Sequence, residues 1–392
     1  MLIGIVGKPN CGKSTFFKAA TMADVLIASY PFATIKPNHA MAYVKIKDLA
    51  TEFGKVSNPR EGYVKKGWRF VPFEIMDVAG LVEGASEGKG LGNQFLDDLT
   101  GADAFVHIVD ISGETDAEGK PTSGYYPGED IKMVESELDK WYLGILKKVW
   151  KNLAKNIEVE KTEFASAVAK QFSGLKVNED DVKHVVLIEK INTNNVGKWT
   201  DDELMKFAQA LRKYTKPMII VTNKIDRPNS KENYEKIKKE FSYPTIPCYS
   251  EGELTLRNAD KAGLIEYVPG EKDFKIVREL NEKQKQALDS IKKIFDGYGS
   301  TGIQEVLNTV VFDILKYIAV FPTPSAKLED SKGNILPDCY LMPFGSTALD
   351  FAYRLHTDIG NNFVKAIDIR TKKAVGKDYK LKHLDVLEIM TK

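Results

Sequence analysis

Cysteine is scarce in this sequence, and long apolar runs are missing. The three cysteines, Cys11, Cys248 and Cys339, are odd in number and far apart, and none forms a Cys-x-x-Cys pair. We therefore expect buried or incidental thiols in a reducing compartment, not a disulfide framework or a zinc site. The five histidines show no metal-ligand spacing. Apolar runs stay well below the ~18 residues of a membrane span, which argues against a membrane protein.

Net charge is almost absent as well. The 392 residues carry 56 Lys and Arg against 55 Asp and Glu, which gives a formal net charge of +1. A strongly basic surface for nucleic acid is therefore not a general property, and any such contact must be local. A strand pattern that begins at Leu2 leaves no room for a signal peptide, so we expect a cytoplasmic protein.

The clearest motif lies near the beginning of the chain. An apolar strand pattern over 2–6 leads into Gly7-Lys8-Pro9-Asn10-Cys11-Gly12-Lys13-Ser14-Thr15, which contains the Gly-x-x-x-x-Gly-Lys-Ser pattern of a phosphate-binding loop. The glycines allow a tight turn whose N–H groups point at phosphate oxygens. Lys13 brings a cation to the β- and γ-phosphates, and the Ser14 hydroxyl suits Mg²⁺. We predict a nucleotide site formed by residues 7–15, at the beginning of a helix whose dipole favours anions.

A second motif follows the strand pattern at 70–76. Asp77-Val78-Ala79-Gly80 ends that strand and precedes a glycine-rich segment, 84–92. The Asp77 carboxylate is suited to reach Mg²⁺ through water, and the Gly80 N–H is suited to meet the γ-phosphate. Because glycines make a segment easy to order and disorder, this region has the character of a switch.

An extended segment, Tyr30 to Asn38, lies between these two motifs. Pro31 and Pro37 fix φ and exclude helix there. In nucleoside-triphosphate switches a threonine in such a loop closes on Mg²⁺ and the γ-phosphate, and Thr34 is the candidate. The predicted metal ligands are Ser14, Thr34 and Asp77, and the predicted catalytic groups are Lys13, Thr34 and Gly80.

A third motif indicates the base. Asn223-Lys224-Ile225-Asp226 follows the apolar run 217–221. A carboxylate at Asp226 accepts hydrogen bonds from guanine N1–H and N2–H₂, a pairing that adenine cannot offer. We expect Asn223 to bind the base edge and the phosphate loop, and the Lys224 stem to pack over the ring. A last strand over 245–250 is expected to place the Ser250 N–H near the base.

The spacing of the strand patterns predicts the architecture. The strand patterns at 105–111 and 217–221 are separated by the residues 112–216, whereas a parallel crossover needs only a dozen or so residues. The interval therefore contains an insertion. Apolar residues at three- and four-residue steps from Ile131 to Leu153 predict a long amphipathic helix in it. Because its charges are mixed, we interpret the insertion as structural, with partner binding as the alternative.

The end of the chain has a different pattern. Helices are expected up to about Tyr317, and Phe321-Pro322-Thr323-Pro324 marks a boundary. Short strands and one helix capped by Ser346 follow. The prediction is an α/β P-loop NTPase domain with a mainly parallel sheet (1–111 and 217–319), a helical insertion (112–216) and a small α+β module (320–392).

These motifs closely resemble those of the Obg-like GTPases, and within them the YchF-type proteins, in an archaeal form. The residues that carry the resemblance are Gly7 to Ser14, Tyr30 to Asn38, Asp77 to Gly92 and Asn223 to Asp226. Gly345 to Ala352, with His356-Thr357-Asp358, resembles a TGS domain, a ubiquitin-like β-grasp module. The resemblance implies a GTPase domain, an inserted helical domain, a TGS domain and a partner in the translation apparatus.

Two departures from the family pattern matter. Many relatives have exchanged Asn-Lys-x-Asp for a variant ending in Glu and prefer ATP, whereas Asn223, Lys224 and Asp226 are intact here. Relatives also carry Ser-Ala after the last strand of the GTPase domain, where this chain has Tyr249-Ser250. That contact is made through the backbone. The second departure therefore weakens the assignment of Ser250 as the contacting residue more than it weakens the predicted function.

We predict a Mg²⁺-dependent switch that binds GTP and hydrolyses it to GDP. Leu81 stands where many switch GTPases carry a water-orienting glutamine, so intrinsic hydrolysis is expected to be slow. Asn10 matches the position of a K⁺ ligand in related potassium-activated GTPases, and K⁺ is a candidate cofactor. The alternative, that Asn10 only shapes the loop, stays open. Two rival functions also stay open: an ATPase of the same fold, and a binding scaffold with negligible turnover.

A basic stretch near the end of the chain offers a local contact for nucleic acid. Its members are Arg370, Lys372, Lys373, Lys377, Lys380 and Lys382, with only Asp378 among them. Strand alternation would place some of these side chains on one exposed face. We predict contact with the ribosome or RNA through the TGS domain, the alternative being an ordinary solvated lysine face. The sequence leaves the oligomeric state undetermined.

Overall fold

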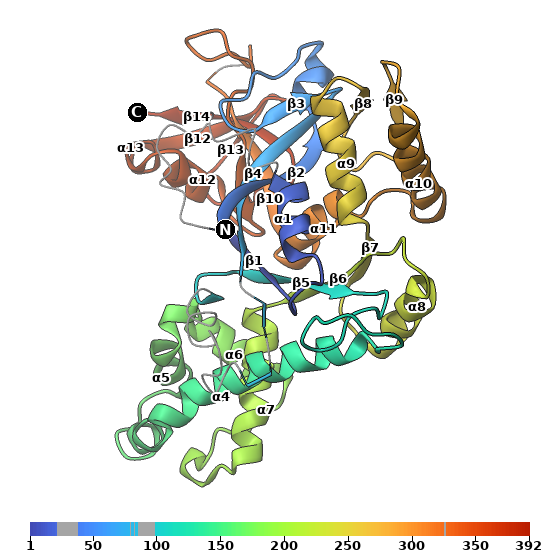
Figure 1. Cartoon of the computed structure of the whole chain (residues 1–392). Coiled ribbons are helices and arrows are strands. Elements are labelled where there is room, and N and C mark those ends of the chain that lie inside the picture. Colours follow the sequence, from blue (N-terminus) through green and yellow to red (C-terminus); the bar gives the residue numbers. More distant parts are fainter. Residues whose placement is uncertain (22–37, 79, 82, 85–98, 325–326) are drawn as a thin grey trace.

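The computed structural model describes residues 1–21, 38–78, 80–81, 83–84, 99–324 and 327–392. Figure 1 shows a twisted sheet at the centre, a helical body below it and a second, smaller sheet at the upper left. Among the described residues, no helix is long and apolar enough to cross a membrane.

The central sheet confirms the predicted fold class. Its strands are β1 (Leu2–Val6), β2 (His39–Lys47), β3 (Tyr63–Lys65), β4 (Trp68–Asp77), β5 (Ala104–Asp110), β6 (Met218–Asn223) and β7 (Thr245–Cys248). In the described part of the chain the order is β2-β4-β1-β5-β6-β7, with β3 beside β4. Neighbours from β4 to β7 are parallel, whereas β2 and β3 pair antiparallel with β4. The carboxyl ends of β1, β4 and β6 therefore meet at one edge, which collects the three predicted motifs.

Helices cover both faces of this sheet, and β5 and β6 are consequently buried along their whole length. Apolar residues of α1 (Lys13–Thr21) and α11 (Ile303–Asn308) share a core with one face. The first turns of α4 (Gly128–Glu158) and the apolar side of α8 (Ser230–Glu240) contribute to the core on the other face. The remaining elements between β7 and the C-terminal module include α9 (Ser250–Lys261), the hairpin β8 (Ile265–Tyr267) and β9 (Phe274–Ile276), and α10 (Glu282–Tyr298).

The helical insertion is organised by its first helix. The predicted amphipathic helix is confirmed as α4, whose 31 residues span about 46 Å at 1.5 Å per residue. Its later turns form a separate core with α5 (Phe164–Gln171), α6 (Glu179–Ile188) and α7 (Asp201–Thr215). A buried ion pair between Asp139 Oδ1 and Arg212 Nε, 2.8 Å apart, ties α4 to α7. One helix therefore contributes both to the core of the sheet and to that of the insertion.

The helix expected up to Tyr317 is wrong in its last residues. After α11 the chain makes a π-helical turn, η6 (Thr309–Ile314), and Tyr317 already begins β10 (Tyr317–Pro322). The apolar side chains of 317–321 alternate between two cores, Ile318 and Val320 in one, Ala319 and Phe321 in the other. Alternation with a period of two is typical of a strand. The helical interpretation of residues 303–317 overlooked it in the last residues.

In its described residues, the C-terminal module contains a second sheet and two short helices. In chain order its strands are β10, β11 (Tyr340–Pro343), β12 (Phe363–Asp368), β13 (Lys373–Val375) and β14 (Asp385–Thr391), and its helices are α12 (Ala348–Leu355) and α13 (Thr357–Asn361). The strand order in the described residues is β11-β10-β14-β12-β13. The predicted cap at Ser346 is wrong by one residue. Thr347 is the N-cap of α12 and forms a capping box with Asp350, because its hydroxyl accepts from the Asp350 N–H.

This module is packed tightly on the central domain. Phe321, Val386 and Ile369 belong to the same apolar core as the central sheet. Arg69 of β4 is 1 % exposed and donates to the carbonyls of Leu336 and Pro337. Because a shared core and a buried guanidinium cross the joint, the two sheets form one continuous packing unit.

Candidate nucleotide site

The phosphate loop adopts the backbone that its glycines were predicted to allow. Gly7 and Gly12 have φ of 147° and 102°. A Cβ on Gly7 would lie 2.4 Å from the Ile108 carbonyl oxygen, and one on Gly12 would lie 2.2 Å from Asn223 Nδ2. Both positions therefore exclude any side chain, for reasons of conformation and of space.

The Lys13 side chain and the Mg²⁺ candidates lie at the end of this loop. Lys13 Nζ donates to the Lys8 carbonyl at 2.8 Å, folding back over the loop. Ser14 Oγ donates to Asp77 Oδ2 at 2.8 Å, so two of the three predicted metal ligands are already in contact. Thr34, the third, lies outside the described residues.

The Asp77 carboxylate fits a hard cation. Burial raises the pKa of Asp77, while the Ser14 hydroxyl and the Lys13 charge oppose that rise. Its Oδ1 atom is buried and has no hydrogen-bond partner in the described part of the chain. A hydroxyl and a carboxylate with an unused oxygen form the donor set that Mg²⁺ prefers, since Mg²⁺ takes oxygen ligands and keeps several waters.

The segment after Asp77 is attached to the phosphate loop. The Leu81 N–H donates to the Gly7 carbonyl at 3.1 Å, and a Cβ on Gly80 would lie 3.0 Å from Pro9 N. Leu81 is 1 % exposed and packs in the core below the sheet. The Leu81 side chain therefore points into the protein, and in this conformation it is not available to a water at the γ-phosphate.

Asn223 joins the base motif to the phosphate loop, as predicted. Its Nδ2 donates to the Cys11 carbonyl at 3.0 Å, and its Oδ1 accepts from the Ser250 N–H at 3.2 Å and the Ser250 hydroxyl at 2.8 Å. The sequence predicted only a backbone contact to the base for Ser250. The structure gives the Ser250 side chain a second role, which is to orient Asn223.

Lys224 connects two further parts of the site. Its Nζ donates to the Asn10 carbonyl at 3.0 Å and to Asp110 Oδ2 at 2.7 Å. Burial raises the pKa of Asp110, but hydrogen bonds from Lys224, Ser112 and Thr115 outweigh that effect and lower it. Asp110 was not predicted from the sequence. Its position at the end of a buried strand, beside the strand that ends in Asn223, was the available signal.

Asp226 lies beside Arg227, with 3.6 Å between Oδ2 and the Arg227 Nε. Burial raises the pKa of Asp226, and the Arg227 charge opposes this, while Glu251 and Glu114 add to it. A half-buried carboxylate among other acids gains most from donors that satisfy both of its oxygens, and guanine offers two such donors on one edge.

A buried network supports the loop after β7. Glu253 is fully buried, and its two oxygens accept from Arg257 Nε at 2.6 Å and the Tyr267 hydroxyl at 2.7 Å. The Thr301 hydroxyl also donates to Glu253, and the Thr301 carbonyl accepts from the Tyr249 N–H at 2.9 Å. This network fixes the beginning of α9, and with it the position of Ser250.

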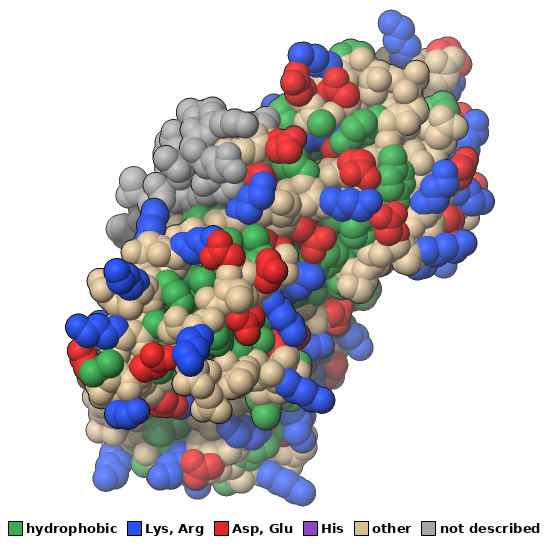
Figure 2. Space-filling view, turned by 90° about the horizontal axis from the view of Figure 1, so that it is seen from below, with side chains coloured by type: hydrophobic (Ala, Val, Ile, Leu, Met, Phe, Trp, Pro, Cys, Tyr) green, Lys and Arg blue, Asp and Glu red, His purple; other side chains and the backbone are tan. Residues whose placement is uncertain are grey.

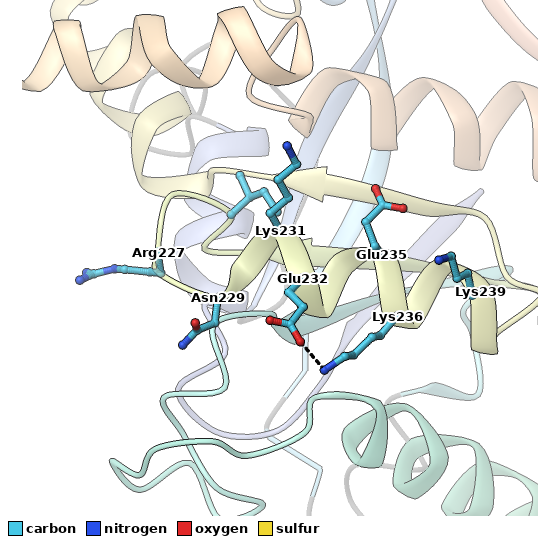
Figure 3. Close-up of a pocket in the computed structure, with 8 residues that line it drawn as sticks. Arg227, Asn229, Lys231, Glu232, Glu235, Lys236 and Lys239 are labelled. Atoms are coloured by element: carbon cyan, nitrogen blue, oxygen red, sulfur yellow. Dashed lines mark ion pairs between the residues drawn. The ribbon is translucent and has the colours of Figure 1, made fainter.

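A hollow of about 650 Å³ lies beside the base motif, on the outer side of α8. Figure 3 shows charged side chains along its rim and the ion pair between Glu232 and Lys236. Its lining consists of Ile225, Arg227, Asn229, Lys231, Glu232, Glu235, Lys236 and Lys239. None of the predicted nucleotide contacts lines it, so it is a surface feature separate from the nucleotide site.

Three family models match the chain. Residues 2–148 match the 50S ribosome-binding GTPase model, and residues 221–324 match the G4 motif-containing domain of the YGR210-like Obg-like GTPases. Residues 320–391 match the TGS domain. The first match covers β1 to β5 and the first two-thirds of α4, the second runs from β6 through β10, and the third covers the C-terminal module.

Similar proteins extend over the whole chain. A GTP-binding protein of Methanocaldococcus jannaschii is 46 % identical over 100 % of this chain and 99 % of its own length. The ribosome-binding ATPase YchF of Bacillus subtilis is 32 % identical over 60 % of this chain and 61 % of its own length. A crystal structure of a GTP-binding protein from Pyrococcus horikoshii is 39 % identical, covers 100 % of both chains and has a TM-score of 0.79. The YchF GTPase of Schizosaccharomyces pombe shares the fold, with 21 % identity, coverage of 100 % and 97 %, and a TM-score of 0.60.

Proposed function

Because this chain belongs to the Obg-like GTPases of the YchF type and carries a C-terminal TGS domain, we propose that it is a Mg²⁺-dependent switch that binds GTP and hydrolyses it to GDP and phosphate. One observation carries the proposal: Asn223 bonds both the phosphate loop, through Cys11, and the base loop, through Ser250. A single side chain thereby sets the distance between a phosphate site and a guanine site.

The proposed catalytic groups stabilise negative charge on the phosphates, and none of them is proposed to transfer a proton. Lys13 leaves the Lys8 carbonyl when a nucleotide enters and neutralises the β- and γ-phosphates. Ser14, Thr34 and Asp77 would hold Mg²⁺, which supplies further positive charge at the same oxygens when bound. The Gly80 N–H meets the γ-phosphate, and residues 7–15 surround the others through their N–H groups.

Asp226 supports guanine over adenine. The ATPase alternative is worth testing because YchF relatives such as that of Bacillus subtilis are named ATPases. Here the Asn223–Asp226 motif is intact. Burial and the nearby acids Glu251 and Glu114 disfavour the charged form of Asp226, and the two N–H donors of a guanine edge would stabilise it. Competition between labelled GTP and excess ATP separates the two functions, since comparable affinities would establish the ATPase alternative.

Turnover without a partner is expected to be slow. The buried Leu81 offers no hydrogen bond to an attacking water, so the rate should lie near or below the unassisted range of ~10⁻⁴ to 10⁻² s⁻¹. Phosphate release measured with and without ribosomes tests this and also the scaffold alternative. A scaffold would release no phosphate under either condition.

The K⁺ question centres on Asn10. Asn10 Nδ2 donates to the Gly119 carbonyl at 3.0 Å, which gives the loop-shaping role a physical basis. The amide oxygen of the same side chain points in another direction from its nitrogen and is the atom that a K⁺ ion would use. Both roles can therefore be served by one side chain, and K⁺ remains a candidate cofactor.

Contact with the ribosome or RNA is proposed for the TGS domain, on a smaller patch than the sequence suggested. Arg370 pairs with Glu52 at 3.2 Å, and Lys380 Nζ donates to the Gly345 carbonyl at 2.8 Å. Lys372, Lys373 and Lys377 stay exposed in or beside the edge strand β13, and Lys382 is exposed just before β14. The first three lysines form the centre of the proposed phosphate-binding patch.

The face of the molecule seen from below carries charges of both signs. Figure 2 shows Lys and Arg mixed with Asp and Glu over the face seen from below, in keeping with the net charge of +1. Relatives of the YchF type are named ribosome-binding, which agrees with a ribosomal partner. Co-sedimentation with ribosomes, with a GTP analogue or with GDP, tests the proposal.

The domain division and the location complete the proposal. We assign 1–111 with 217–319 to the GTPase domain, 112–216 to the insertion and 320–392 to the TGS domain, and we move the last boundary to 316/317 because β10 pairs within the C-terminal sheet. Cys11 and Cys248 are buried free thiols, and a ribosomal partner is found in the cytoplasm, so we place the protein there.

A further inference from the structure

Lys8 is an unusual residue at the centre of the phosphate loop because its side chain is completely buried. It is 0 % exposed, although it is a lysine in a loop. Its Nζ lies 2.9 Å from Asp130 Oδ2 and donates to the Thr115 carbonyl at 2.8 Å. The same ammonium lies over the Tyr125 ring, 4.3 Å from its centroid. A buried ammonium is stable only with such compensation, so these partners hold Lys8 in place.

Asp130 belongs to the first turn of α4, the helix that organises the insertion. It is 1 % exposed, and its second oxygen accepts from the Tyr125 hydroxyl at 2.9 Å. Burial raises the pKa of Asp130, and the Lys8 ammonium and the Tyr125 hydroxyl oppose that rise. In the Lys8–Asp130 pair, each charge thus stabilises the other against the cost of burial.

The loop that leads into α4, residues 111–127, contacts the phosphate loop a second time. The Gly119 carbonyl accepts from Asn10 Nδ2 at 3.0 Å. Gly119 has φ of 80°, and a Cβ there would lie 2.5 Å from the Pro9 carbonyl oxygen. Gly119 is thus required by the close approach of the two backbones, and the lead-in loop lies directly against residues 9 and 10.

The segment after Asp77 also contacts α4. The Gly84 N–H donates to Glu137 Oε1 at 3.1 Å, and Glu137 is 1 % exposed. Asp130 and Glu137 are seven residues apart, about two helical turns, and therefore lie on the same side of α4. One helix consequently holds both the phosphate loop, through Asp130, and the loop that senses the γ-phosphate, through Glu137.

We propose that Lys8 and Asp130 form a positioning pair that makes the lead-in loop 111–127 and the first turn of α4 a structural part of the nucleotide site. The inference rests on the proposed function and goes beyond it by assigning the insertion a role in nucleotide affinity. Because binding free energies are reciprocal, a partner that displaces α4 changes nucleotide affinity, and a bound nucleotide stabilises the beginning of the insertion.

The test uses the full chain and labelled GDP. Asp130→Asn leaves Lys8 buried without a counter-charge, so the phosphate loop must relax, and GDP should bind about tenfold more weakly or worse. Lys8→Met combined with Asp130→Asn removes the uncompensated charge, so part of the lost GDP affinity should return, to a level still below that of wild type. Recovery by a second substitution is a result that general destabilisation would not give.

Asp139→Asn is the matched control. It breaks the other buried ion pair of α4, Asp139 with Arg212, which contacts α7 and not the phosphate loop. It should lower thermal stability to a similar degree and leave GDP affinity unchanged at temperatures where the protein is folded. If Asp130→Asn does not fold, Tyr125→Phe removes one hydrogen bond of the same cluster and should weaken GDP binding a few-fold.

Hydrogen exchange provides a second readout. GDP should slow exchange across 111–127 in the wild type, and this protection should be reduced in Asp130→Asn. Equal GDP affinity in wild type and Asp130→Asn, or equal weakening in Asp139→Asn, would overturn the positioning role while leaving the GTPase proposal intact. A wild type that binds no guanine nucleotide would overturn the proposed function itself and this inference with it.

Discussion

The lysines of the nucleotide site and those of the C-terminal module differ in how they are held. Lys8, Lys13 and Lys224 each donate to a backbone carbonyl, and Lys8 and Lys224 also pair with a carboxylate that is at most 1 % exposed. Lys372, Lys373 and Lys377 are exposed around a three-residue edge strand. Lys8 and Lys224 are positioned before any ligand arrives, and Lys13 is held against the phosphate loop until a ligand arrives, whereas the exposed lysines can only attract a ligand.

This difference has an energetic consequence. Interactions at a buried, pre-positioned site are little screened by salt, whereas those of exposed charges decay over about 8 Å at physiological ionic strength. We therefore expect the nucleotide site to be sensitive to single substitutions and insensitive to salt. The C-terminal patch should behave in the opposite way, with small effects per residue and strong salt dependence.

The largest expected effect is at Asp226. Asp226→Ala removes the proposed two-point contact to guanine, so GTP affinity should fall by about 100-fold or more. Titration of labelled GTP at low and high salt measures it, and the loss should be the same at both. A control is Glu251→Ala, which removes a nearby acid that is expected not to contact the base. If the loss of GTP affinity in Asp226→Ala disappears at high salt, Asp226 acts as a screened, exposed charge and does not bind the base directly.

The second effect concerns a buried group that has no partner. His107 is fully buried in β5, neither ring nitrogen has a hydrogen-bond partner in the described residues, and burial lowers its pKa to about 3. The unfolded chain therefore binds a proton below pH ~6.5 that the folded chain does not bind, so stability falls as pH decreases. Between pH 7 and 5 the loss from His107 should be about 2 kcal/mol.

Urea unfolding at pH 7 and pH 5 measures this. His107→Leu should flatten the pH dependence, and His184→Gln, at an exposed histidine stacked on Tyr214, should leave it as in the wild type. If His107→Leu retains the full wild-type slope, carboxylates and not His107 account for the acid sensitivity.

The third effect is at the C-terminal patch. Lys372→Glu/Lys373→Glu/Lys377→Glu should weaken co-sedimentation with ribosomes about tenfold at low salt, and little at high salt. The slope of log affinity against log salt should flatten by about one unit for each phosphate contact removed. Lys206→Glu/Lys283→Glu/Lys293→Glu changes net charge equally at exposed, scattered positions and is the control. Identical sedimentation of all three proteins would move the search for the partner contact to the insertion.

The smallest effect is expected from the monovalent cation. Replacing Na⁺ by K⁺ should raise the GTPase rate a few-fold if the Asn10 amide oxygen holds the ion, and Asn10→Ala should abolish the difference. Lys8 would still hold the loops together in that variant, through the Thr115 carbonyl and Asp130. Equal rates in both salts, with Asn10→Ala unchanged, would leave Asn10 with its contact to Gly119 alone.

The contrast between the two sets of lysines also explains why some predictions from the sequence were more successful than others. The Gly7–Ser14 loop and the Asn223–Asp226 motif place their side chains through backbone geometry that a few residues specify, so their local form was predictable. The basic stretch at 370–382 was predicted as one patch, but Arg370 is paired with Glu52 and Lys380 with a backbone carbonyl. Those partners are 318 and 35 residues away in sequence, beyond the reach of any local pattern.

The misplaced helix end at Tyr317 and the cap at Thr347 instead of Ser346 have another origin. Apolar residues at 303–317 fit a helical period until the two cores on either side of β10 impose a period of two. At 346–347 both residues are good caps, and the Asp350 side chain, which accepts from the Thr347 N–H, decides between them. In each case the tertiary or reciprocal contact overruled a local preference.

By itself, the sequence determined the local form of three motifs, namely the phosphate loop, the strand that ends in Asp77 and the Asn223–Asp226 motif, and their order along a mainly parallel sheet. These follow from short-range rules, because glycine conformations, strand ends and hydrogen-bond donors are properties of a few adjacent residues. Only the tertiary structure showed which acidic residues hold these motifs in place. They are Asp110, Asp130 and Glu137, and each binds a residue more than fifty positions away in the sequence. Such buried partners depend on which surfaces meet after folding, since the stability of a buried charge is decided by its neighbours in space.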